Sequence, residues 1–395
     1  MKVSGKIALG SAIISAGILA FILWSDIAVH DRRSEQIPPI NSNKPFSKTW
    51  DIFRGDSRLT GVADGHLRDK LKIAWKFNAG GQVKSSPVVS DGKVYFGSTE
   101  GTVYAVAAED GDEVWSLKLP DAVEASVCIV DRMAYVGCAD GFIYAIDAEY
   151  GKEKWKYKTG DKVLGSANSF DDEGNKRIIA GSYDGKIYCL ESEDGSDVWD
   201  YSTDNYINGS PAIGDGIVVA GGCDAMIHIV NVADGKPIRQ IEIGAYIAGS
   251  AAIFDGRAYL GNYDEVFLCA DIATGNIVWE YQAPEGPIIS SPAVNKDIVV
   301  FGCGDGLLYC LDRNSGDKKW KFKGGEAFDS SPVICDDKVV VGCEDGRLYM
   351  VDIESGKKVW EYETGSAITS SPAIAAGLVI VGCDDGFVYA FDGIP

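Results

Sequence analysis

The chain has 395 residues and a formal net charge of −21, from 58 acidic and 37 basic residues. A surface this acidic repels phosphate backbones and anionic headgroups, which argues against nucleic acid as a partner and against adsorption on anionic lipid. The 47 glycines, with frequent tryptophan and tyrosine, predict many short strands joined by tight turns.

The first 24 residues are predicted to be a single-pass membrane anchor. The stretch Ile7–Trp24 is uncharged and mostly apolar, near the lower limit for a helix that spans a bilayer. Two lysines precede it and Asp26 follows, so the positive-inside rule leaves the N-terminus in the cytoplasm and the rest of the chain outside. A cleaved signal peptide is the alternative, although cleavage after Ala28 would put Asp26 where a small residue is preferred.

Residues 25–49 are predicted to form a polar tether between the anchor and the rest of the chain. They include Pro38, Pro39 and Pro45, which disfavour regular structure and stiffen the backbone.

A repeat with a period of about 40 residues follows, which is typical of solenoids, propellers and arrays. It is marked by one tryptophan in each unit: Trp75, Trp115, Trp155, Trp199, Trp279, Trp320 and Trp360. Arg239 takes the tryptophan position in the unit between Trp199 and Trp279, which makes eight positions. Each tryptophan is expected to pack as a flat apolar plate between neighbouring units.

Each unit contains four strand signals and no helical periodicity, and four antiparallel strands form a propeller blade. An Asp345-Gly346 turn in the seventh unit suits a tight hairpin. The last unit, Ser371–Asp392, lacks its tryptophan-bearing strand, and the strand at Lys72–Phe77 precedes the first complete unit. The sequence therefore predicts an all-β, eight-bladed propeller over residues 50–395, whose N-terminal strand closes the last blade and which one transmembrane helix precedes.

The ten cysteines are interpreted mostly as buried free thiols rather than disulfides or metal ligands. Most recur at two repeat positions that hold serine or alanine in other units, no CxxC occurs, and the three histidines are scattered. The insertion at residues 171–175 is read as a solvated loop, with a weak cation site as the alternative. We expect no metal, cofactor or catalytic residue.

The repeat resembles the tryptophan-docking motif of the pyrroloquinoline-quinone (PQQ) enzyme family, as in Asp271, Thr274, Gly275 and Trp279. The segment from Trp50 to Val62 is similar to the leader of PQQ-like propellers. The chain also resembles the B subunit of the Bam outer-membrane assembly machinery, an eight-bladed propeller without catalytic residues. Two departures are that the chain lacks the adjacent Cys-Cys pair of PQQ dehydrogenases and the lipoprotein cysteine of the Bam subunit.

The loops that enter the first strand of each unit are predicted to ring one mouth of the central channel. Aromatic and polar groups at a concave mouth suit recognition of a protein. The candidate partner-binding residues are Lys84, Glu124, Tyr206, Asn208, Tyr246, Phe328 and Asp329. The fourth and fifth units depart from the repeat at Asp224-Ala225-Met226 and Asp264-Glu265, which indicates either a partner surface or ordinary repeat decay.

The sequence as a whole favours a non-enzymatic, membrane-anchored scaffold with its propeller in the periplasm or at the cell exterior. Its expected partners are proteins of the cell envelope, and nucleic acid is not among them. An envelope or outer-membrane protein assembly factor is one alternative, and a PQQ-dependent oxidoreductase is the other.

Overall fold

The computed structural model describes residues 47–393, which lie in the compact unit Asn43–Pro395. Strands and turns make up this unit, and no helix within the described residues is long and apolar enough to cross a membrane. The expected anchor at residues 1–24 and nearly all of the tether at residues 25–49 lie outside the described residues.

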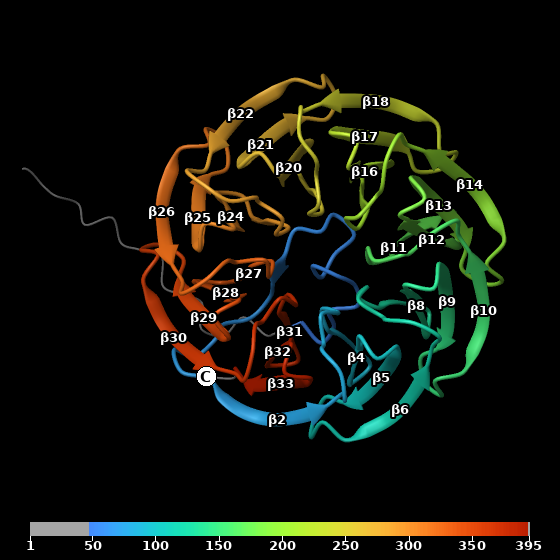
Figure 1. Cartoon of the computed structure of the whole chain (residues 1–395), viewed down its shortest axis with the longest axis horizontal. Helices are drawn as coiled ribbons and strands as arrows, with labels where there is room; N and C mark the ends of the chain where they lie inside the picture. Colours follow the sequence, from blue (N-terminus) through green and yellow to red (C-terminus); the bar gives the residue numbers. More distant parts are fainter. Residues whose placement is uncertain (1–46, 394–395) are drawn as a thin grey trace, which may run out of the picture. The chain divides into compact units, whose positions relative to one another are not determined.

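Eight four-stranded antiparallel blades surround a central axis, as predicted (Figure 1). The innermost strands of blades 1 to 8 are β3 (Val88–Ser90), β7 (Cys128–Val130), β11 (Asn168–Asp172), β15 (Ala212–Gly214), β19 (Ala252–Phe254), β23 (Ala293–Val294), β27 (Val333–Cys335) and β31 (Ala373–Ala375). The second strands are β4 (Lys93–Gly97), β8 (Met133–Gly137), β12 (Asn175–Gly181), β16 (Ile217–Gly221), β20 (Arg257–Gly261), β24 (Ile298–Gly302), β28 (Lys338–Gly342) and β32 (Leu378–Gly382). The third strands are β5 (Thr102–Ala107), β9 (Phe142–Asp147), β13 (Lys186–Glu191), β17 (Met226–Asn231), β21 (Val266–Asp271), β25 (Leu307–Asp312), β29 (Arg347–Asp352) and β33 (Phe387–Asp392). The outermost strands are β6 (Glu113–Lys118), β10 (Glu153–Lys158), β14 (Asp197–Ser202), β18 (Pro237–Glu242), β22 (Ile277–Gln282), β26 (Lys318–Lys323), β30 (Lys358–Glu363) and, in blade 8, β2 (Lys72–Asn78).

The ring closes through β2, which supplies the outermost strand of blade 8. It runs antiparallel to β33, with Trp75 opposite Ala390. The predicted closure is therefore confirmed, and it joins the two ends of the described chain in one blade (Figure 1). Without β2, blade 8 would have three strands and β33 would be its unpaired outer edge.

The repeated tryptophans pack between blades, as predicted. In blade 1, the indole Nε1 of Trp115 donates to the carbonyl of Ala148 in blade 2 at 3.0 Å, and Trp75 of blade 8 makes the same contact with Ala108 at 2.9 Å. A Cβ added at Gly151 would lie 2.6 Å from the ring of Trp115, so this glycine, with a φ of +68°, is needed for the close approach. An indole N–H thus joins six blades to the next, and in blade 4 the guanidinium of Arg239 makes the equivalent bond to the carbonyl of Ala273 at 2.9 Å.

The N-terminal segment Ser47–Ala63, called the strap below, crosses the middle of the ring (blue in Figure 1) and joins all eight innermost strands. Its carbonyl oxygens accept a backbone N–H from seven blades, at Val89, Ile129, Ile213, Ile253, Val294, Ile334 and Ala376, over 2.7–3.0 Å. The remaining blade, blade 3, contributes the side-chain amide of Asn168, which donates to the carbonyl of Ser57 at 2.7 Å. The strap ends in β1 (Val62–Ala63), which pairs in parallel with β27.

The insertion at residues 171–175 is mostly exposed, as expected of a solvated segment, but it is a strand hairpin and not an irregular loop. It lengthens β11 and β12 into a hairpin that turns at Glu173 and Gly174, both with positive φ. The carboxylates of Asp171 and Asp172 pair with the adjacent basic side chains of β12 at 2.8 and 3.0 Å. The two carboxylates are therefore committed to cations of the chain itself.

All ten cysteines are free thiols, and all except Cys223 are buried. The interpretation of these positions as small apolar core residues is confirmed. Burial raises the pKa of Cys128 to about 12, which keeps this thiol protonated and unreactive near neutral pH.

Candidate functional site

One end of the central channel opens as a cavity of about 190 Å³, called the mouth below. The loops that enter the first strands ring this cavity, as predicted, and each contributes one equivalent residue: Lys84, Glu124, Leu164, Asn208, Ala248, Ile289, Asp329 and Thr369. Four of the seven candidate partner-binding residues (Lys84, Glu124, Asn208 and Asp329) therefore line one cavity.

A ring of eight buried serines lies in the wall of the mouth. Each serine stands two residues before the innermost strand of its blade. These serines are Ser86, Ser126, Ser166, Ser210, Ser250, Ser291, Ser331 and Ser371. In seven cases, the backbone N–H of one serine donates to the Oγ of the serine in the next blade, at 2.8–3.1 Å. The ring thus satisfies backbone groups that crowd the axis, and it makes the wall polar.

The strap seals the other end of the channel. Phe53 forms part of the floor of the mouth, and the neighbouring Arg54 is only 1% exposed. The Arg54 guanidinium donates to the carbonyls of Pro292 and Ser331 at 3.1 Å each, and also to that of Pro332. Burial lowers the pKa of Arg54 to about 9, against a smaller opposing effect of Asp56. The channel is therefore blind, and its contents can exchange with solvent only through the mouth.

Tyrosines edge the mouth beside blades 3 to 5. Tyr206 and Tyr246, both predicted, are 48% and 58% exposed, and Tyr263 is 48% exposed. The ring of Tyr183 stacks on Tyr206 at 5.0 Å between centroids, and its hydroxyl donates to the side-chain oxygen of Asn208 at 2.8 Å. Burial raises the pKa of Tyr183, and the negative charge of Glu124 adds to this. These tyrosines form an exposed apolar surface that continues into the polar cavity.

Carboxyl groups edge the mouth beside blades 7 and 8. Burial raises the pKa of Asp329 to about 7, and a hydrogen bond and repulsion with Glu344 act in the same direction. Burial also raises the pKa of Asp384, whose carboxylate accepts the hydroxyl proton of Thr369 at 3.1 Å and is attracted by Lys84. The two sides of the mouth thus differ in chemistry, with phenol rings on one and carboxyl groups on the other.

The prediction that Phe328 contributes to the partner surface is wrong. Its side chain is fully buried and lies between Phe322 and Tyr349, at 6.3 and 6.1 Å between ring centroids. A Cβ added at Gly302 would lie 2.6 Å from the Cβ of Phe328, so this side chain fills the space beside blade 6. The side chain is therefore not accessible to a partner.

Sequence reasoning missed Tyr183, Tyr263, Glu344 and Asp384. All four occupy one repeat position, the second residue after the glycine that ends the second strand of each blade. Their backbone N–H groups bond the loops that carry the ring of the mouth, as Tyr263 N does to the carbonyl of Tyr246 at 3.0 Å. Alignment of this position across the eight units would have found this outer ring.

One group of side chains has the composition of a metal site, although the histidines were expected to be scattered. His66, Asp336 and Asp337 bring ligand-type atoms within 4.8 Å of one another. Both carboxylates already have cationic or polar partners in the chain, because His66 Nδ1 lies 2.9 Å from Asp336 and the ammonium of Lys338 lies 2.7 Å from Asp337. The group fastens the segment after the strap to blade 7.

Comparison with solved structures supports the PQQ-like fold. BamB from Moraxella catarrhalis is 20% identical, with a TM-score of 0.70 over 82% of this chain and 100% of that chain. A quinohemoprotein alcohol dehydrogenase from Comamonas testosteroni is 15% identical, with a TM-score of 0.73 over 87% of this chain and 80% of that chain. The computationally designed Ika8 protein is 17% identical, with a TM-score of 0.71 over 81% and 99%. Because BamB, an alcohol dehydrogenase and a designed protein share this fold, the fold alone does not assign a function.

Comparison with known sequences identifies the family. No curated protein sequence matches the chain. A family model described as the beta-propeller of beta-alanine-activating enzyme matches residues 94–334, from the second strand of blade 1 to the innermost strand of blade 7. The chain therefore belongs to this family of β-propellers, whose PQQ-like repeat it shares with BamB.

Proposed function

We propose that the chain is a non-enzymatic scaffold that binds a protein partner at the mouth, and that its N-terminal segment anchors it on the outer side of the cytoplasmic membrane. The observation that carries this proposal is the asymmetry of the channel. The strap seals one end, and the other end opens between exposed tyrosines. A concave surface with aromatic side chains and a polar rim is the usual anatomy of a protein-recognition site.

The two sides of the mouth define the chemistry of the partner. Tyr206, Tyr246 and Tyr263 offer rigid, amphipathic rings that bury apolar area at low cost in side-chain entropy. Asp329, Glu344 and Asp384 favour a basic group on the opposite side, in keeping with the net charge of −21. The best fit is an extended protein segment that carries apolar and basic side chains.

A PQQ cofactor does not fit the residues that line the mouth. PQQ carries carboxylates, which need arginine or lysine partners. Lys84 is the single basic side chain that lines the cavity, and Glu124 and Asp329 line it as well. Arg54 lies beneath, and its guanidinium is committed to three backbone carbonyls. The donor set therefore supports a scaffold over the oxidoreductase alternative.

The test is capture of partners by crosslinking in native membranes, for the wild type and for the double variant Tyr206→Ala/Tyr246→Ala. We expect the double variant to fold normally, because both rings are exposed, and to lose most of the captured protein. Tyr150→Ala is the matched control, since Tyr150 is 64% exposed but lies in the β9–β10 turn at the end of blade 2 remote from the mouth.

The identity of the captured protein separates the two forms of the proposal. Capture of a barrel-assembly protein would make the chain an envelope assembly factor, and capture of other envelope proteins would support a different scaffold role. Equal capture by the wild type and by the double variant would show that the mouth is not the binding site.

A further inference from the structure

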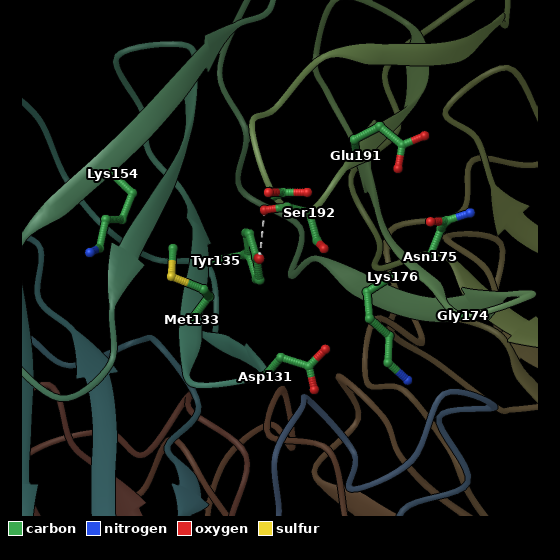
Figure 2. Close-up of a pocket in the computed structure, with 10 residues that line it drawn as sticks. Asp131, Met133, Tyr135, Lys154, Gly174, Asn175, Lys176, Glu191 and Ser192 are labelled. Carbon is green, nitrogen blue, oxygen red and sulfur yellow. Dashed lines mark hydrogen bonds between the residues drawn. The ribbon is translucent and has the colours of Figure 1, made fainter.

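A second concave site lies between blades 2 and 3, at the end of the blades remote from the mouth. It is a groove of about 460 Å³, within the range of small-molecule sites. Figure 2 shows Tyr135 at its centre, with Asp131 and Met133 of blade 2 on one side and Glu191 and Ser192 of blade 3 on the other. The lengthened β11–β12 hairpin adds Gly174, Asn175 and Lys176 to its wall.

The floor of the groove is fixed by hydrogen bonds. The Tyr135 hydroxyl donates to the carbonyl of Ser192 at 2.9 Å, and the indole of Trp155 donates to the same carbonyl at 3.1 Å. Tyr135 is 1% exposed, and burial raises its pKa to about 12, so the phenol stays protonated. Because the Tyr135 hydroxyl already donates its hydrogen to the carbonyl of Ser192, its oxygen can only act as an acceptor toward a donor in the groove.

The repeat itself shows what such a groove can hold. The groove between blades 5 and 6 has the same two side chains at equivalent positions. Asp255, like Asp131, is the first residue after the innermost strand. Tyr259, like Tyr135, is the third residue of the second strand. In this case Arg313, the equivalent of Ser192, fills the groove from within the chain.

The contacts of Arg313 define the chemistry of the equivalent site. Its Nε donates to the backbone carbonyl of Lys296 at 3.1 Å, and its Nη1 lies 3.5 Å from the hydroxyl of Tyr259 and 3.5 Å from the carboxylate of Asp255. It also lies over the ring of Phe254, at 4.7 Å from the centroid. Between blades 5 and 6, a planar cation is therefore held by a backbone carbonyl, an aromatic ring, a tyrosine hydroxyl and an aspartate carboxylate together.

Between blades 2 and 3 the tyrosine and the aspartate remain, but the internal cation is absent. Ser192 is too short to fill the groove, and the two lysines of its wall are committed elsewhere. Lys154 pairs with Asp147 at 3.1 Å and Lys176 with Asp171 at 2.8 Å. The Asp131 carboxylate makes no ion pair within residues 47–393. The pKa of Lys176 is raised mainly by its hydrogen bond to Asp171, and the charge of the nearby Asp131 adds a smaller effect in the same direction.

We infer that this groove binds a guanidinium or primary ammonium group on a short alkyl chain. The cation lies between the Asp131 carboxylate and the Tyr135 hydroxyl, and the alkyl chain contacts Met133. Such a group can come from a free small molecule or from an arginine side chain of a partner. The groove between blades 1 and 2, of about 420 Å³, does not offer this site, because Lys93 lines it beside Asp91, at the position that Met133 takes in the groove between blades 2 and 3.

The test is calorimetric titration of the full chain with butylguanidinium, with butyrate as the anionic control. We expect Ser192→Arg to abolish binding, because the new guanidinium takes the place that Arg313 holds in the equivalent groove. Asp131→Asn should weaken binding by about tenfold or more, the usual effect of removing a hydrogen bond to a charged group. Asp91→Asn, the same change in the groove between blades 1 and 2, should leave the affinity unchanged.

Two results would overturn the inference: no binding of butylguanidinium at millimolar concentration, or equal affinity in the wild type and in Asp131→Asn. The second criterion decides the matter even if Ser192→Arg does not fold. A parallel titration with the capped tripeptide acetyl-Gly-Arg-Gly-amide distinguishes a free small molecule from an arginine side chain of a partner. Binding of either ligand supports the site. Tighter binding of the tripeptide indicates an arginine of a partner, and tighter binding of butylguanidinium indicates a free small molecule.

Discussion

Arg54 is the residue of the strap on which we expect the blind channel to depend most. The informative change is Arg54→Met, which keeps most of the side-chain volume and removes the guanidinium. At 1% exposure, Arg54 joins the strap to blade 6 through the carbonyl of Pro292 and to blade 7 through those of Ser331 and Pro332. Its pKa, lowered to about 9 by burial, still leaves it charged at pH 7.

The magnitude follows from the three carbonyls that the variant leaves without a donor. A buried acceptor that loses its partner costs about 1–3 kcal/mol. Removal of a buried charge offsets part of this, because the guanidinium itself is costly to desolvate. At the lower end of the range for each carbonyl, we expect the free energy of unfolding to fall by about 3 kcal/mol.

Urea denaturation measures this loss, and amide hydrogen exchange locates it. The amides of Val294 and Ile334 donate to the strap at 2.8 and 2.9 Å, so their protection should fall in Arg54→Met. Arg58→Met is the matched control in the same strap, since Arg58 is 42% exposed and pairs only with Asp215 at 2.6 Å. A surface pair of this kind contributes about 0–1 kcal/mol. If the two variants lose the same stability and protection at Val294 and Ile334 is unchanged, the guanidinium does not hold the strap in place.

Two further predictions concern the packing between blades and the acidic side of the mouth. Trp115→Ala should lower the free energy of unfolding by about 3–5 kcal/mol, measured by urea denaturation, because a ring that is 8% exposed loses its contacts and its bond to Ala148. Asp329→Asn should match the wild type at pH 3, below the unfolded pKa, and be more stable by about 1–2 kcal/mol at pH 8, allowing for screening at the open cavity. The sign follows from the raised pKa: folded Asp329 keeps its proton up to about pH 7 beside Glu344, so the wild type loses stability as the pH rises from about 4 to 7. Equal stability of Asp329→Asn and the wild type at pH 8 would contradict this.

The blades and their closure could be predicted because the repeat encodes them locally. Each strand is bounded by its own turn residues, and the missing tryptophan strand of the last unit left one place for the strand at Lys72–Phe77. The ring of the mouth followed for the same reason: Lys84 and Asp329 occupy equivalent positions, and rotational symmetry brings equivalent positions to one axis.

The path of the strap could not be predicted from the sequence, because it depends on contacts with all eight blades and the strap has no repeat of its own. Two differences from the prediction were also nonlocal. Phe328 follows an apparently exposed loop, but its burial depends on Gly302 of the neighbouring blade. The hairpin at residues 171–175 depends on ion pairs across two strands, at Asp171 and Asp172, that a linear reading does not register.

The irregular turns of blades 4 and 5 allow the two explanations offered for them to be separated. Ala225 and Glu265 have φ values of +67° and +65°, at the positions where regular blades carry glycine. A non-glycine residue in this conformation costs about 1 kcal/mol, so Ala225→Gly and Glu265→Gly should each raise the free energy of unfolding by about 0.5–1 kcal/mol. Both turns lie at the mouth, in the loops that contact Tyr206 and Tyr246 through backbone hydrogen bonds. If the two glycine variants gain stability and still capture the partner in native membranes, the departures are repeat decay. If capture falls while stability rises, the strained turns belong to the partner surface, and the chain has kept them at a cost in stability because they shape the tyrosine side of the mouth.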